Sequence, residues 1–375
     1  MNISEKELIY RLALINTKGI GPQKARMIRA RWGSVHEAYQ QIRSEGDVEV
    51  TPYLKRCISK MGAQIEKAKR GYDELKSFGI DVISQDCKSY PDRLLHCSDA
   101  PFLLFSKGRA QKKHKRVVSI IGTRKPTKQG IDNCRNIVEE LQAMDVCVVS
   151  GLAIGIDTVA HRTALQMGIH TEAVVAHGLD HVYPRSNSSL FHEITENGRI
   201  LSEFGLGVKP FPSHFPMRNR IVAGMSDATI VIESGLKGGS MITANIAHSY
   251  DRVVMAIPGQ TSDSNYKGCH ALIKSLKAAL VENATDVAQN LGWEYESDTL
   301  DMQRRKQHKE LDLKALTLDE IHVYKTIEKM TNVDIEGLQH SLSINPSKLA
   351  SLLLQLEMLG HVRVHPSKGY SINHV

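Results

Sequence analysis

This chain of 375 residues has few aromatic side chains and no long apolar run. Phe, Trp and Tyr make up 5% of it, which argues against the long base-stacking platforms of single-strand-binding proteins. It contains no stretch of about 18 apolar residues, which a membrane-spanning helix would need. Charged residues stand near the N-terminus, where a secretory signal would have its apolar core. We therefore expect a cytoplasmic protein that makes no membrane contact.

The chain also lacks the side-chain groupings that metal sites and common catalytic mechanisms require. Its six cysteines are scattered, without a Cys-x-x-Cys pair, and its seventeen histidines form no cluster with cysteines or carboxylates at metal-ligand spacing. No Ser-His-Asp or Cys-His arrangement can be argued from the spacing of these residues. We expect reduced thiols, no metal site and no catalytic residues.

Signatures of nucleotide cofactors are missing as well. The G-x-G-x-x-G fingerprint does not follow the first core strand, where Gly122-Thr123-Arg124 stands instead, and there is no Walker A lysine motif. The sequence therefore predicts no cofactor. The formal net charge of +7 favours a polyanionic partner.

The central residues 76–293 alternate short apolar strands with helices, and this pattern predicts a mainly parallel, doubly wound, Rossmann-like α/β sheet. Strands are expected at 81–83, 102–105, 117–121, 147–149, 171–175, 200–202, 229–232 and 253–257, and helices at 131–144, 158–167, 189–197, 215–224, 240–250 and 271–279. Ligands of such sheets bind outside the carboxyl ends of the strands.

One strand-to-helix turn organises this domain. The strand at 147–149 is followed by Ser150-Gly151, and helical spacing starts at Ile156. Such a turn directs backbone N–H groups and the positive end of a helix into one crevice, which suits a phosphate. Small residues at the turn are equally compatible with packing alone, so both interpretations stay open.

Several turns of the same domain place cations beside small residues, and a chain of phosphates suits this set better than one phosphate does. The cations are Arg124, Lys125, Arg185, Arg218, Arg220 and Lys237. Arg218 or Arg220 could instead pair with Glu203 or Asp227 inside the domain.

The flanking segments predict two smaller units. Residues 1–75 give helices, one of them at 58–75, around a Gly19-Ile20-Gly21 turn that resembles a helix-hairpin-helix or SAM-like domain. That turn either approaches a nucleic-acid phosphate or only packs two helices. Polar residues 294–312 predict a linker. Residues 313–375 predict a winged helix, and the scarcity of cations on its third helix favours an accessory or protein-contact role over duplex reading.

The motifs of the central domain together resemble those of the DprA/Smf family of bacterial DNA-processing proteins. They occur in family order: Tyr90-Pro91, Asp99-Ala100-Pro101, IIGTRKP at 120–126, SGLAIGID at 150–157 with Ala160-His161, GLD-x-x-YP-x-x-N at 178–187, SEF at 202–204, FP-x-RNRI at 215–221, GGS-x-ITA at 238–244, and Pro258-Gly259 with Gly268-Cys269. Ala176-His177 and His270 depart from the family pattern.

The resemblance implies a Rossmann-like domain that binds single-stranded DNA, forms a homodimer and delivers the strand to the RecA recombinase during natural transformation. It implies no enzymatic activity, and a single-strand-binding protein is a further candidate partner. The DNA-binding residues predicted on this basis are Gly122, Thr123, Arg124, Lys125, Ser150, Gly151, Arg185, Asn187, Arg218, Asn219, Arg220, Lys237, Gly239, Ser240 and Thr243.

Two other functions stay open. Glu233 followed by Gly238-Gly239-Ser240 is similar to LOG-type nucleoside-monophosphate phosphoribohydrolases, although there the glycines precede the acid. The alternative is therefore a nucleotide-binding or nucleotide-hydrolysing Rossmann enzyme, and a third hypothesis is a duplex-binding regulator that acts through the winged helix. Tyr183, Phe211 and Phe215 are the nearest candidates for base stacking, but core packing is expected for each.

Overall fold

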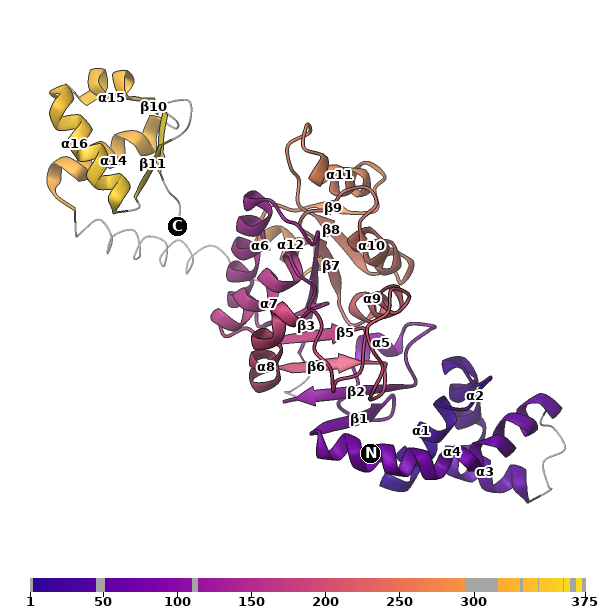
Figure 1. The fold of residues 1–375 in the computed structure, drawn as a ribbon. Helices are drawn as coiled ribbons and strands as arrows, with labels where there is room; N and C mark the ends of the chain where they lie inside the picture. Colours follow the sequence, from indigo (N-terminus) through magenta and orange to yellow (C-terminus); the bar gives the residue numbers. More distant parts are fainter. Residues whose placement is uncertain are drawn as a thin grey trace. The chain divides into compact units, whose positions relative to one another are not determined.

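The computed structural model describes residues 3–44, 51–109, 114–293, 316–330, 333–342, 344–359, 361–364 and 369–372 (Figure 1). These residues divide into two compact units, one within 1–295 and the other within 296–375. Each unit is described by itself.

A mixed sheet of nine strands forms the centre of the first unit, in the order β1-β2-β6-β5-β4-β3-β7-β8-β9. The strands are β1 (Ile80–Ser84), β2 (Leu103–Gly108), β3 (Arg116–Ile121), β4 (Val146–Ser150), β5 (Thr171–Val175), β6 (Arg199–Ser202), β7 (Ala228–Val231), β8 (Val253–Ala256) and β9 (Ala279–Leu280). All strands from β6 to β9 in this order run parallel, and β1 and β2 continue the sheet antiparallel at the β6 edge. The expected doubly wound, mainly parallel sheet is thereby confirmed.

Helices cover both faces of this sheet (Figure 1). They are α5 (Asp92–Leu95), α6 (Lys128–Leu141), α7 (Ile156–Gln166), α8 (Ser188–Asn197), α9 (His214–Gly224), α10 (Gly239–Ser249), α11 (Lys267–Lys274) and α12 (Ala284–Leu291). Val118 and Ile120 of β3 pack with α6, α7 and α12, whereas Val117 and Ile121 pack with α9, α10 and α11. Successive residues of a strand point to opposite faces, so the unbroken apolar run of β3 fills both layers.

The direction in which the sheet grows reverses at β3. From β3 the chain adds β4, β5 and β6 on one side, and then returns to add β7, β8 and β9 on the other side. The loops that leave the carboxyl ends of β4 and β7 therefore diverge around the end of β3. A crevice for a ligand is expected at this point of a doubly wound sheet.

One departure from the predicted elements lies near the end of the sheet. The helix expected at 271–279 is α11, which covers Lys267–Lys274. It starts earlier because Asp263 accepts a hydrogen bond from the Asn265 N–H and opens a 3₁₀ turn that leads directly into the helix. Part of the remaining stretch is the two-residue strand β9, which is too short to give a periodic pattern.

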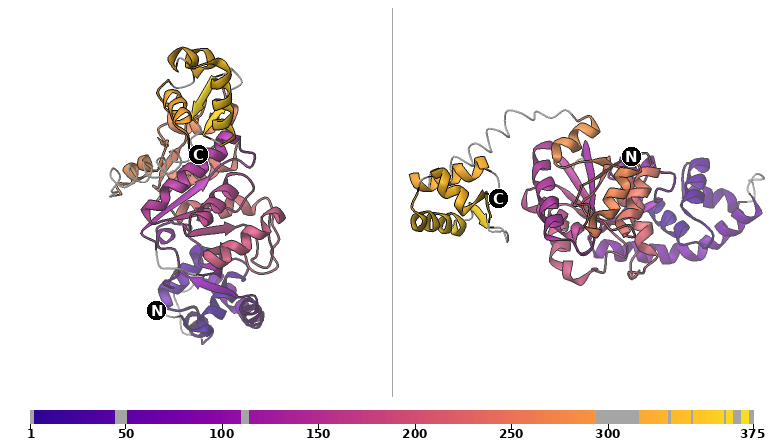
Figure 2. Two further views of the ribbon diagram at one scale, coloured as in Figure 1. Left: turned by 90° about the vertical axis from the view of Figure 1, so that its left-hand side faces the viewer. Right: turned by 90° about the horizontal axis from the view of Figure 1, so that it is seen from above.

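In the described part of the chain before the sheet, the helices are α1 (Glu5–Ile15), α2 (Pro22–Trp32), α3 (Val35–Arg43) and α4 (Pro52–Ser77). The helix expected at 58–75 starts earlier, at Pro52, because the Thr51 hydroxyl caps its first turn. In both views of Figure 2 the N-terminal helices lie beyond the β1–β2 edge of the sheet.

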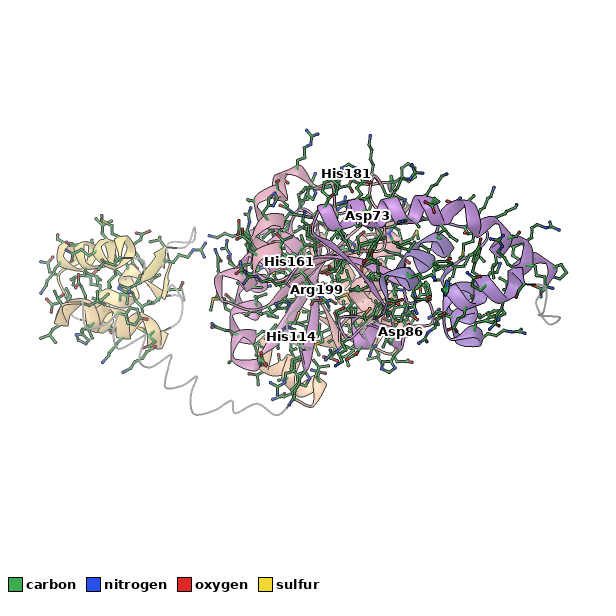
Figure 3. The ribbon with its side chains drawn as sticks, turned by 90° about the horizontal axis from the view of Figure 1, so that it is seen from below. Asp73, Asp86, His114, His161, His181 and Arg199 are labelled. Atoms are coloured by element: carbon green, nitrogen blue, oxygen red, sulfur yellow. The ribbon has the colours of Figure 1, made fainter. Side chains whose placement is uncertain are left out.

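A buried arginine joins these helices to the sheet. Arg11 of α1 is 3% exposed and donates to Glu7 at 2.7 Å and to Asp86, just after β1, at 2.7 Å. Arg29 of α2 also pairs with Asp86, which Figure 3 labels at this junction. The helices and the sheet therefore form one unit rather than two separate bodies.

The second unit contains the three helices expected from the sequence, α14 (Leu318–Met330), α15 (Ile335–Leu342) and α16 (Pro346–Met358). Strands β10 (Val333–Asp334), β12 (Gly369–Ile372) and β11 (Val362–Val364) form a small antiparallel sheet in that order. Leu349, Leu353 and Leu356 of α16 fill its core. The linker expected at 294–312 lies outside the described residues. Among the described helices, none is long and apolar enough to cross a membrane.

Candidate nucleic-acid interface

A cavity of about 650 Å³ opens at the carboxyl ends of β3, β4 and β7. Gly122 follows β3, Gly151 follows β4, and the loop from Ser234 to Gly238 follows β7. The structure thus places the cavity at the reversal point of the sheet, where the topology predicts a ligand. The predicted site residues that line it are Gly122, Thr123, Arg124, Gly151, Arg218, Asn219, Gly239, Ser240 and Thr243.

The first turn of α10 faces this cavity and is suited to an anion. Its N-cap residue is Gly238, which has no side chain to accept from the first N–H groups of the helix. Gly239 is exposed, and Ser240 shares a hydrogen bond of 2.8 Å with Ser234. The positive end of an uncapped helix favours a negatively charged group.

The turn after β4 does not present its amides to a ligand in the way that the sequence suggested. The N–H groups of Gly151 and Ala153 donate to the Asp157 carboxylate at 3.1 and 3.3 Å. A side chain of the protein therefore occupies the anion position of this turn. The sequence predicted no role for Asp157, although an acidic residue in the first turn of a helix, as here in α7, is a typical capping residue.

Arg218 places a positive charge in the floor of the cavity. It is 5% exposed, and its Nη1 donates to the Val174 carbonyl at 2.6 Å and to the Gly151 carbonyl. Burial lowers the pKa of Arg218 to about 10, while the nearby Asp157 raises it, so the guanidinium stays charged at neutral pH. A Cβ on Gly151 would lie 2.6 Å from this guanidinium, so a larger residue there would displace the Arg218 side chain.

Arg124 and two aromatic rings form the mouth of the cavity. The Arg124 guanidinium carbon lies 5.3 Å from the centre of the Phe215 ring, and the Tyr183 ring lies 6.0 Å from that of Phe215. Arg124 is exposed, Tyr183 is 44% exposed and Phe215 is partly exposed. An exposed cation over an aromatic ring can meet a phosphate and a base at the same time.

The expectation that three aromatic residues pack in the core is wrong. Phe211 is 60% exposed, and Tyr183 and Phe215 line the cavity. The low aromatic content gives the number of aromatic rings in the chain but does not show that several of them lie together at the cavity. A signal was present in the sequence, since Tyr183-Pro184 stands in a loop and Phe215-Pro216 at the start of a helix, both outside the apolar runs.

Three further predicted cations are exposed but do not line the cavity. Lys125 follows Arg124, Lys237 belongs to the loop after β7, and Arg185 stands just before α8. Their side chains can reach a strand that runs along the carboxyl edge of the sheet. They are not part of the cavity wall itself.

The remaining predicted site residues point into the protein. The buried Ser150 hydroxyl donates to the Ile120 carbonyl at 2.7 Å, and the Asn187 amide donates to the Leu152 carbonyl at 3.0 Å. Arg220 pairs with Glu203, as the alternative interpretation held, whereas Asp227 pairs with Arg93 instead. Ser150, Asn187 and Arg220 thus hold the loops in place from behind.

Two other polar side chains near the crevice are engaged in the fold. The buried Glu233 accepts from the Thr127 N–H at 3.0 Å and from its hydroxyl at 2.8 Å, which fixes the start of α6. His161, labelled in Figure 3, bonds the Thr171 hydroxyl at 2.7 Å. Burial, with Arg218 nearby, lowers the pKa of His161 to about 3, so its ring is neutral.

The fold and crevice define a class: a Rossmann-like protein with a cationic, aromatic-rimmed site at the carboxyl ends of its parallel strands. Within that class, the family model of DNA recombination-mediator protein A matches residues 81–292, and the chain belongs to this family. The DprA/Smf resemblance of the sequence is thereby confirmed.

Relatives and solved structures agree with this assignment. The chain is 42% identical over 214 residues to the DNA processing protein DprA of Streptococcus pneumoniae, covering 57% of this chain and 74% of the relative. It is 33% identical over 277 residues to protein Smf of Synechocystis sp., covering 72% of this chain and 69% of the relative. The crystal structure of DprA from Streptococcus pneumoniae matches with a TM-score of 0.61 at 33% identity, over 79% of this chain and 100% of that one.

One solved relative is described by its ligand. DprA from Helicobacter pylori, whose structure concerns a single-stranded DNA binding mode, matches with a TM-score of 0.51 at 29% identity. The match covers 56% of this chain and 95% of that chain.

Proposed function

We propose that this chain binds single-stranded DNA along the crevice at the carboxyl ends of β3, β4 and β7. The observation that carries the proposal is the exposed Arg124 guanidinium stacked on Phe215 above the buried charge of Arg218. The single-stranded DNA named for the Helicobacter pylori relative supports the same ligand.

In this proposal each part of the crevice meets a different part of the strand. Arg124, Lys125 and Lys237 contact phosphates from the rim, and the open start of α10 receives one phosphate from below. Tyr183 and Phe215 stack on a base, which does not select a sequence. Ser150, Asn187 and Arg220 act through the loops they hold rather than by touching DNA.

Fluorescence anisotropy with labelled oligo-dT and a matched duplex, measured across a salt series, tests the proposal. We expect preference for the single strand and an affinity that falls by roughly 0.7 log units per log unit of salt for each phosphate neutralised. Absence of single-strand binding, together with stoichiometric binding of AMP in calorimetry, would favour a nucleotide-binding protein instead.

Replacing Arg124 by Glu tests the assignment of the crevice. We expect the affinity for oligo-dT to fall by about tenfold or more, because a charged contact is lost and a repulsive one appears. The salt slope should also decrease by roughly 0.7. Arg135→Glu on α6 is the matched control, since it makes the same charge change on an exposed residue outside the cavity. Equal affinities for the two variants would contradict the assignment.

We further propose the role that the family resemblance implies, a homodimer that delivers the strand to RecA, with single-strand-binding protein as a second protein partner. One apolar surface suits a second copy of the chain: Leu276 is 91% exposed, and Leu280 on the edge strand β9 is 48% exposed. Light scattering of the purified chain decides the oligomeric state. A strand-exchange assay with RecA, on DNA precoated with single-strand-binding protein, tests the delivery step.

A further inference from the structure

A second cluster of chemically active side chains lies at the opposite edge of the sheet from the crevice. We propose that His114, Cys147 and His170 bind one divalent transition-metal ion, and that Zn²⁺ is the ion that fits this donor set best. This site takes no part in the proposed DNA binding.

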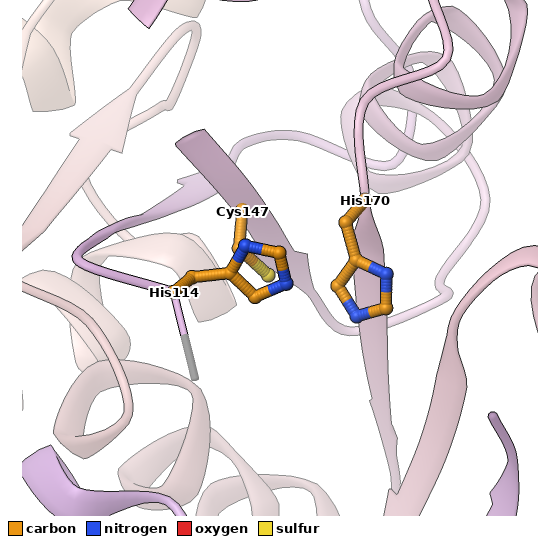
Figure 4. Close-up of side chains that lie close together, drawn as sticks. All are labelled: His114, Cys147 and His170. Carbon is orange, nitrogen blue, oxygen red and sulfur yellow. The ribbon is translucent and has the colours of Figure 1, made fainter. Parts of the chain in front are cut away.

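The strand order brings these three residues together. His114 stands two residues before β3, Cys147 is the second residue of β4, and His170 directly precedes β5. The strands β3, β4 and β5 are parallel neighbours, so their starts meet at one edge. The ligand atoms of all three residues lie within 4.8 Å of one another (Figure 4).

Polar atoms in this cluster are buried without a hydrogen-bond partner among the described residues. His170 is 8% exposed and its Nδ1 has no partner, and neither does Nε2 of His114, whereas Nε2 of His170 faces Glu172. A buried nitrogen without a partner loses its contact with water and gains no replacement. A metal ion would give each imidazole the partner that the protein does not provide.

The donors suit a particular kind of ion. Two imidazoles and one thiolate favour Zn²⁺ and its neighbours Co²⁺ and Cu²⁺ over Mg²⁺ or Ca²⁺, which prefer oxygen. Zn–N and Zn–S bonds of about 2.0–2.3 Å require the ligand atoms to draw closer. The rings of His114 and His170 are stacked with centres 4.5 Å apart, so one ring must turn to aim its nitrogen at the ion. His114 is only half buried and can make this turn.

A carboxylate stands where a metal-bound histidine usually has its second partner. Glu172 Oε1 lies 3.5 Å from His170 Nε2, and Arg199 holds this carboxylate with hydrogen bonds of 2.6 and 3.1 Å. Such a carboxylate fixes the ring orientation and leaves Nδ1 of His170 free for the ion. Binding replaces the proton of the Cys147 thiol by the metal, and that proton is released to solvent.

The test uses the full-length chain without a histidine tag, stripped by a chelator and kept reduced with a phosphine. Co²⁺ is the probe, because a cobalt–thiolate bond gives a charge-transfer band in the near ultraviolet that histidines alone do not give. We expect one equivalent of Co²⁺ to produce the band and one equivalent of Zn²⁺ to abolish it. Zn²⁺ should also raise the melting temperature, since it binds only the folded chain.

Variants separate this site from adventitious binding to surface histidines. Cys147→Ser should lose the band. His170→Gln should lower the affinity for Co²⁺ by at least ~100-fold, because loss of a residue that only hydrogen-bonds a metal ligand can already cost that much. Cys87→Ser and the exposed His192→Gln should behave as the unmodified chain does.

If circular dichroism shows that a core variant is unfolded, His114→Gln at the half-buried position carries the test. Loss of the band and of the Zn²⁺-dependent rise in melting temperature in that variant would support the site. Failure of the unmodified chain to bind Co²⁺ stoichiometrically would overturn the proposal. So would binding that gives no thiolate band, or that persists in all three ligand variants.

Discussion

The crevice owes its charge balance to a few buried side chains. Arg218 is held by two carbonyl oxygens, and Asp157 occupies the anion position in the neighbouring turn. Burial raises the pKa of Asp157, while Arg218 and the amides that it accepts from oppose that rise. The net positive charge offered to a ligand therefore comes from Arg124 and the rim rather than from the floor alone.

Among the single residues, replacing Phe215 distinguishes the contribution of base stacking to DNA affinity from that of charged contacts. Phe215→Ala should weaken binding of oligo-dT by about 1–3 kcal/mol, as the loss of one stacked base does, and should leave the salt slope unchanged. Phe211→Ala is the matched control, an exposed ring in the segment just before α9 that does not line the cavity. Anisotropy across a salt series measures both quantities. An unchanged affinity for Phe215→Ala would mean that the bases do not reach this ring.

Glu172 gives a prediction on pH. Burial alone would raise its pKa, but Arg199 and His170 lower the pKa to about 2, below its ordinary value of 4.5. A carboxyl whose pKa is depressed by folding stabilises the protein above pH 4.5, and this contribution is lost as pH falls toward 2. Glu172→Gln should therefore be less stable by about 3–5 kcal/mol at pH 7, because Arg199 is left buried without its counter-charge.

Urea unfolding at a series of pH values checks this expectation. The difference in unfolding free energy between the unmodified chain and Glu172→Gln should shrink below pH 4.5. Glu66→Gln, an exposed carboxyl of α4, is the control and should show no comparable difference. A gap that stays constant down to pH 2 would contradict the ion-pair explanation.

Among the helices and strands, a substitution at the start of α10 should change the stability of the fold and the affinity for DNA in opposite directions. Gly239 is its first residue, and a Cβ there would meet no described atom within 4 Å, so a larger side chain fits. Gly239→Asp should stabilise the fold by about 0.3–1 kcal/mol, because an acidic group favours a helix start. The same charge should repel a phosphate and weaken oligo-dT binding. Thermal unfolding and anisotropy measure the two effects.

Gly239→Ala is the control for this pair of effects, since it keeps every backbone N–H group and adds no charge. It should bind oligo-dT as the unmodified chain does. If Gly239→Asp binds equally well, the start of α10 does not receive a phosphate.

The elements also mark the limit of what the sequence predicts. Strands such as β4 were predicted to within one residue of each observed end, because a strand buried on both faces is a nearly continuous apolar run. The two-residue β9 carries no such signal. Spacing placed Ser150 and Asn187 at the right turns but could not say that their side chains point inward.

The cluster of His114, Cys147 and His170 shows the same limit more sharply. Each residue stands at the start of a different strand, and only the strand order brings them within 4.8 Å. The three residues stand far apart in the sequence, which therefore predicted no metal site. Contacts between strands that are distant in the chain are fixed by topology, which spacing does not encode.

For the whole molecule, the question is whether the second unit contributes to DNA binding. Lys348, the one cation of α16, pairs with Asp319 at 2.5 Å. The same helix exposes two large apolar side chains, Leu354 at 58% and Met358 at 81%, beside polar ones such as Gln355. A surface that reads a DNA groove needs free positive charge, whereas an apolar one suits contact with a protein.

Deleting residues 313–375 should therefore leave the affinity for oligo-dT within about twofold, or ~0.4 kcal/mol. The crevice belongs to the first unit, which keeps its own core when the second is removed. Anisotropy with the single strand and the duplex measures the effect, and circular dichroism confirms that the shortened chain is folded. A loss of single-strand affinity beyond tenfold would place a DNA contact in the second unit. Loss of duplex binding alone would instead identify a separate duplex contact there, because the crevice keeps all of its cations in the shortened chain.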